Sequence, residues 1–173
     1  MDPNSPEAQA ELTRRHKAAA TTVLGLVVAT ILLSIVAYLG RPYFTEQPPN
    51  PPLDFAVRIV ILVLGLGAVV WRRTKFQPAR LKDIAGLDGV SGLVRTIEKT
   101  TLQVALLGAA IAVTGFVTTL ITGNELYTFW SGAIAIVVLV YGYPTKSSWL
   151  RTVSRYTDPQ ADVPPPPSSP EAV

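Results

Sequence analysis

The residues that could do chemistry are few, and most of them lie in one polar segment, residues 72–100. This segment carries three carboxylates, Asp83, Asp88 and Glu98. Carboxylates serve as general acids, general bases or metal ligands only where other titratable groups support them. The chain has no cysteine, and its single histidine, His16, lies far from the segment in the sequence. The sequence therefore predicts no catalytic residue, no metal site and no cofactor, and we do not expect an enzyme.

Three glycines, Gly86, Gly89 and Gly92, recur at every third position of the same segment. They match neither a GxGxxG nor a Walker pattern, so nucleotide binding is not predicted. Each glycine costs about 1 kcal/mol in a helix interior. We therefore expect two short helices with a break within residues 86–92.

Apolar residues of this segment recur close to helical spacing and have basic neighbours. The apolar stripe consists of Leu81, Ile84, Leu87, Val94 and Ile97. This pattern resembles that of a helix at a membrane surface whose charges meet anionic headgroups. We favour a structured linker that covers the helix ends, and a docking or lipid-recognition surface is the alternative. The candidate lipid or partner contacts are Arg72, Arg73, Lys75, Arg80, Lys82, Arg95 and Lys99.

Arg58 is the one ionisable residue inside an apolar stretch, which by default makes it a candidate functional residue. Asp54 lies four residues earlier on the same helix face and can pair with it, and Glu125 is a second candidate partner. We expect an outer ion pair of Asp54 and Arg58. A ring of Arg58 side chains that attracts anions in an oligomer is the alternative.

Small residues form a stripe on one face of the third apolar stretch, at spacings of three and four. They are Gly108, Ala112, Gly115, Thr119 and Thr122. Such a stripe allows another helix to approach closely. We expect helix packing here, with a face of Thr21, Gly25 and Ala29 as a plausible partner. A polar path lined by Thr114, Thr118 and Thr122 is the rival interpretation.

Four apolar stretches must position these residues: 18–39, 55–71, 101–121 and 126–143. The chain is 49% hydrophobic and only 16% charged, against about 25% charged in soluble domains. Each stretch approaches the roughly 20 residues that cross a bilayer. The first is longer than the core of a signal peptide, so we expect it to stay uncleaved. The sequence predicts an all-α membrane protein with a four-helix transmembrane bundle.

The basic residues set the expected orientation. Of the 15 lysine and arginine residues, all but Arg41 and Arg58 fall in the N-terminal segment, the 72–100 segment or the C-terminal segment. This asymmetry predicts two in-out-in hairpins with both termini cytoplasmic. A multi-pass protein of the bacterial inner membrane is the expected location.

The connections differ in character. We expect a disordered N-terminal tail at 1–17, a proline-rich outer loop at 40–54 that ends with Asp54 as a helix N-cap, and a tight outer turn at 122–125. The 144–173 tail should be disordered and proline-rich from about residue 157.

The expected function is that of a non-catalytic membrane subunit or scaffold that acts through helix packing and the basic 72–100 segment. A small homo-oligomeric channel or transporter is the alternative. The expected partners are the bilayer, with anionic headgroups at the cytoplasmic face, and another membrane protein or a second copy of the chain. The net charge of +3 is too small to suggest nucleic-acid binding.

Overall fold

The computed structural model describes residues 6–44, 48 and 50–157 of the 173-residue chain. Every regular element in this part is a helix. The elements are α1 (Pro6–Gly40), the short 3-10 helix η1 (Arg41–Tyr43), α2 (Pro51–Lys75), α3 (Pro78–Thr122), α4 (Leu126–Gly142) and α5 (Lys146–Thr157). The prediction of an all-α protein is confirmed.

Three helices, α1, α2 and α3, are long and apolar enough to cross a membrane. α4 has 17 residues, and it meets the same criterion only together with α5, from which a bend of 46° separates it. The bend contains Pro144, which lacks a backbone N–H and cannot continue a helix. The described chain therefore offers three apolar spans, or four when α4 is counted with α5.

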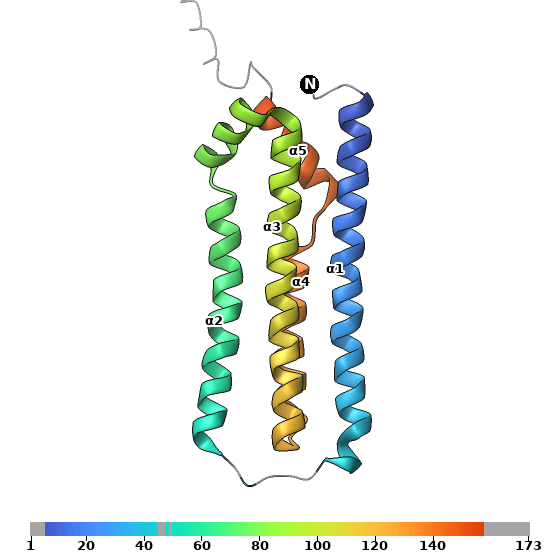
Figure 1. Cartoon of the computed structure of the whole chain (residues 1–173), viewed down its shortest axis with the longest axis vertical. Helices are drawn as coiled ribbons and strands as arrows, with labels where there is room; N and C mark the ends of the chain where they lie inside the picture. Colours follow the sequence, from blue (N-terminus) through green and yellow to red (C-terminus); the bar gives the residue numbers. More distant parts are fainter. Residues whose placement is uncertain (1–5, 45–47, 49, 158–173) are drawn as a thin grey trace, which may run out of the picture.

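α3 and α4 form the centre of the structure, and α1 and α2 pack against both from opposite sides (Figure 1). One buried apolar cluster joins α2, α3 and α4: Val57, Ile61, Ala68, Val104, Ile111, Ala112, Ala135 and Val138. A smaller cluster of Val23, Ala105 and Leu139 joins α1 to the central pair. The outward faces of α1 and α2, including Leu24, Leu39, Leu62 and Leu66, stay exposed.

A third cluster, here called the cap core, lies at the end of the bundle that carries the basic residues. It consists of Leu12, Ala19, Leu81, Val90, Leu93, Val94, Ile97 and Trp149. These side chains come from the first turns of α1, the N-terminal part of α3 and α5. The helices thus continue past the apolar spans into a small folded cap with its own buried apolar centre.

The N-terminal segment differs from the expectation. Residues 6–17, predicted to belong to a disordered tail, form the first turns of α1. Their composition lacks the long apolar run of a span, but Leu12 is buried in the cap core and Arg15 bonds to α3. Tertiary contacts supply the stabilisation that the local sequence does not reveal.

The 72–100 segment also differs in part. The helix is interrupted at Gly89, whose φ of 63° is the left-handed conformation that glycine adopts at little cost. The break therefore falls within the predicted 86–92 range. No second interruption separates this segment from the apolar stretch, because residues 90–122 continue as one helix. Charged residues such as Arg95 and Lys99 are good helix formers and do not end the helix.

α2 begins earlier than expected. Its N-cap is Asn50, whose side-chain oxygen accepts a hydrogen bond from the Leu53 N–H at 3.3 Å. Asp54, predicted to be the cap, lies in the first turn. The prolines at the first helical positions explain the difference, because their fixed φ suits a helix start and their missing N–H is not needed there.

Candidate functional site

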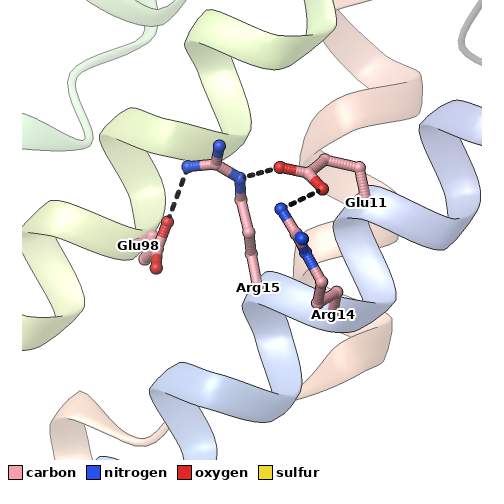
Figure 2. Close-up of polar contacts among 4 residues, drawn as sticks. All are labelled: Glu11, Arg14, Arg15 and Glu98. Carbon is pink, nitrogen blue, oxygen red and sulfur yellow. Dashed lines mark hydrogen bonds and ion pairs between the residues drawn. The ribbon is translucent and has the colours of Figure 1, made fainter.

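Arg15 joins the start of α1 to α3 (Figure 2). Its guanidinium lies 2.9 Å from the Glu98 carboxylate and also binds Glu11 one turn earlier. Arg14 pairs with the same Glu11 carboxylate at 2.9 Å. Hydrogen bonding from Arg15 holds the pKa of the Glu11 carboxyl below its usual value, and hydrogen bonds to Glu11 and Glu98 raise the pKa of Arg15. Both shifts favour the charged forms, as expected for an ion-pair cluster that links α1 to α3.

His16 lies beside this cluster and fixes α1 to the bend between α4 and α5. Its Nε2 is 2.9 Å from the Pro144 carbonyl oxygen. The ring meets Trp149 edge-on, with 5.5 Å between ring centroids. Because Trp149 is buried in the cap core, the single histidine of the chain contributes to packing at this bend.

The apolar stripe of the 72–100 segment faces inward. Leu81, Val94 and Ile97 are buried in the cap core, Ile84 is half-buried, and only Leu87 is strongly exposed, at 85%. A helix bound to a membrane surface would leave this stripe available to lipid. The geometry agrees instead with the favoured interpretation, a structured linker that covers the helix ends.

The predicted basic contacts divide into two groups. Arg72 lies over the Tyr141 ring at 4.5 Å, and Lys75 lies over the Trp71 ring at 4.6 Å, so both are held by cation–π contacts. The second group is exposed and consists of Arg73, Lys82, Arg95 and Lys99. The side chain of Arg80 lies outside the described residues.

The small-residue stripe of α3 faces α4. A Cβ on Gly108 would lie 3.0 Å from Leu139 Cγ, and one on Gly115 would lie 2.7 Å from the Tyr127 carbonyl oxygen and overlap Ser131. These distances leave no room for a larger side chain at Gly115. Ala112 is buried in the same interface.

Two hydroxyl-bearing residues complete the α3–α4 contact. Thr119 and Thr128 are fully buried, with 2.7 Å between their hydroxyl oxygens. Thr122 instead donates to the Thr118 carbonyl at 2.8 Å. The threonines satisfy one another and their own helices, as polar groups inside a helix bundle must.

The face of Thr21, Gly25 and Ala29 on α1, a plausible partner for the stripe, does not contact it. All three residues are exposed, and a Cβ on Gly25 would meet nothing within 4 Å. α1 instead presents Val23 and Thr30 to the bundle. That face of α1 is therefore available to lipid or to another protein.

The opposite end of the bundle holds the predicted outer ion pair. Arg58 and Asp54 lie 2.8 Å apart. The Tyr127 hydroxyl of α4 donates to the same aspartate at 2.9 Å, which ties α2 to α4. Glu125, the other candidate partner of Arg58, instead pairs with Arg41 at 3.3 Å.

The carboxylates that could do chemistry are dispersed. Asp83 and Asp88 are exposed, and Glu98 is engaged by Arg15. Among the described residues, no three His, Asp or Glu side chains are grouped so that they could hold a metal ion. A cavity of about 50 Å³ lies beside Arg72 and Trp149, far below the roughly 300 Å³ of small-molecule sites.

An open groove of about 440 Å³ lies on the outward face of α3, with Arg15 of α1 at its edge. Sequence reasoning did not identify this groove or the cluster around Arg15. The spacing of Glu11 and Arg15, four residues apart, was a usable signal for a helix that begins before the apolar stretch. The contact with Glu98 spans 83 positions and had no local signal.

Comparison with known proteins does not assign the chain to a family: no family model, no curated protein and no solved structure matches it.

Proposed function

We propose that the chain is a non-catalytic subunit or scaffold of the bacterial inner membrane, in which α1 to α4 each cross the bilayer and both termini are cytoplasmic. The distribution of basic residues supports this orientation, because only Arg41 and Arg58 lie at the outer end. α4 is short for a span at 17 residues, or about 26 Å. Tyr127 in its first turn and Tyr143 just after its end suit the headgroup level at the two ends.

The observation that carries the scaffold role is the pairing of a folded cap with two exposed apolar helix faces. The cap core links three helices and therefore fixes the shape of the cap. The exposed basic residues of the cap, Lys82, Arg95 and Lys99, form its basic surface. Below it, α1 and α2 have most of their apolar residues on the outside. Such faces suit lateral contact with another membrane protein, and the fixed basic surface suits a cytoplasmic partner.

The alternative, a homo-oligomeric channel, has no equivalent supporting feature among the described residues of one protomer. The threonines of the rival polar path, Thr114, Thr118 and Thr122, each donate to the carbonyl four residues earlier, at 2.8 Å. Side chains bonded in this way offer few groups to a permeating ion. A channel would therefore need several copies of the chain, arranged so that their Arg58 side chains line a path at the outer end.

The test is extraction of the protein in a mild detergent, followed by measurement of its mass and identification of the proteins that remain bound. We expect a defined complex with at least one different membrane protein. A closed ring containing only this chain would contradict the scaffold role and favour the channel.

A further inference from the structure

The groove on α3 combines charge and apolar surface along one helix face. Arg95 and Lys99 lie at one end of its lining, and Leu102 and Leu106 lie at the other. Spacings of three and four place these four residues in one continuous stripe. The basic side chains belong to the cap, and the leucines belong to the apolar span. The stripe therefore crosses the level at which lipid headgroups meet acyl chains.

The two cations are available to a ligand. Arg15 at the groove edge is occupied by Glu11 and Glu98, and Glu98 is the one carboxylate in the lining. Arg95 and Lys99 are both exposed, and neither forms an ion pair with a carboxylate in the described part of the chain. Gln103 beside them accepts a hydrogen bond from the Trp71 indole N–H of α2 at 3.1 Å, which holds this side of the groove against α2. The site thus offers two positive charges at a position held by neighbouring helices.

The apolar face of α3 that continues beyond the groove has about the length of one leaflet. Leu106 is 68% exposed, and Val113, two turns further along the same face, is half exposed. Leu102 to Val113 spans about 16 Å of helix, close to the roughly 15 Å of one hydrocarbon leaflet. α1 and α2 pack on opposite sides of the central pair, so neither covers this face of α3 (Figure 1). An acyl chain can lie along it.

We propose that the groove binds one anionic glycerophospholipid, with Arg95 and Lys99 on the headgroup phosphate and an acyl chain along Leu102 and Leu106. This rests on the membrane location and orientation in the proposed function. The chemistry fits because basic side chains above apolar surface at the cytoplasmic side attract anionic headgroups more strongly than zwitterionic ones, which carry no net charge. The bound lipid would complete the surface between α1 and α2.

The experiment is native mass spectrometry of the purified full chain in detergent, titrated with phosphatidylglycerol or phosphatidylcholine. We expect one phosphatidylglycerol to bind well before any phosphatidylcholine. The Arg95→Gln/Lys99→Gln variant should weaken that first binding by about 25-fold, roughly fivefold for each charge removed. The Arg95→Lys/Lys99→Arg variant keeps both charges and should bind like the wild type.

A matched control removes two exposed cations of the same end that do not line the groove, in Lys17→Gln/Arg73→Gln. It should change the affinity by less than about twofold, because these charges are outside the groove. An equal loss in both double variants, or equal binding of the two lipids, would overturn the proposal. Inorganic phosphate should not displace the lipid beyond the effect of sodium chloride at equal ionic strength, and displacement beyond it would indicate a soluble anion site instead.

These results are independent of the scaffold test. The titration uses the purified chain alone, so a homo-oligomer would contradict the scaffold role while leaving the lipid result intact. Loss of lipid selectivity would contradict the groove while leaving a hetero-complex intact.

Discussion

The guanidinium of Arg15 in α1 lies 2.9 Å from the carboxylate of Glu98 in α3, 83 positions later in the chain. Both side chains are partly exposed, so solvent screens the pair and limits its contribution to about 1 kcal/mol. We predict a coupling of about 0.5–1 kcal/mol between Arg15→Gln and Glu98→Gln in a double-mutant cycle of detergent unfolding. Arg14, which contacts Glu11 and not Glu98, provides the control pair. A coupling of Arg14 to Glu98 as large as that of Arg15 would contradict the geometry.

Glu11 should make the stability of the cap depend on pH in a defined direction. Its pKa lies below the ordinary value of 4.5 because Arg15 and Arg14 bind the carboxylate. A lowered native pKa means that the stabilisation is complete above 4.5 and is lost as the pH falls through the native value. We predict that the unfolding temperature falls below pH 4.5 in the wild type and falls less steeply in Glu11→Gln. Equal slopes in the two proteins would show that Glu11 is not bound in solution.

Gly115 has the closest neighbours of the glycines in the α3–α4 interface. In Gly115→Ala the new methyl group would overlap Ser131, which can move, and would lie 2.7 Å from the Tyr127 carbonyl oxygen, which is backbone. We predict destabilisation by about 1–3 kcal/mol. Gly25→Ala is the matched control, because its methyl group meets nothing within 4 Å. It should stabilise the helix by about 0.5–1 kcal/mol. Shifts of the same sign in a detergent-unfolding assay would contradict the close contact.

Local signals in the sequence predicted much of this architecture. The apolar stretches, the turn at Gly123, the stop before Pro144 and the break near Gly89 all depend on properties of neighbouring residues. The helical state of residues 6–17 was not predicted, because it depends on burial of Leu12 and on Glu98, far along the chain. The partner of the small-residue stripe was wrongly sought on α1, because spacing shows that a helix can approach and not which helix does so. The groove was not predicted either, because residue spacing does not show which face of α3 the neighbouring helices leave uncovered.

An ion-flux experiment on Arg58 can distinguish the scaffold role from the channel role. It pairs with Asp54 at 2.8 Å, and its side chain is 75% exposed at the end of the bundle opposite the cap core. Such a pair contributes at most about 1 kcal/mol, so Asp54→Asn should leave assembly nearly unchanged. We predict no specific ion flux from liposomes that contain the wild type or Arg58→Leu. A robust anion flux in the wild type that disappears in Arg58→Leu would make Arg58 part of a conduction path.

The most direct test of the proposed membrane protein is the side of the membrane on which each connection lies. Because the chain has no cysteine, single cysteines can be placed at four exposed positions, Asn50, Ser91, Asn124 and Ser147. In intact cells, an impermeant thiol reagent should label the cysteines at Asn50 and Asn124 and leave those at Ser91 and Ser147 unlabelled. All four should label once the membrane is permeabilised, which checks that each site is reactive. Labelling of the Ser91 cysteine in intact cells would place the basic end outside and contradict the four-span topology.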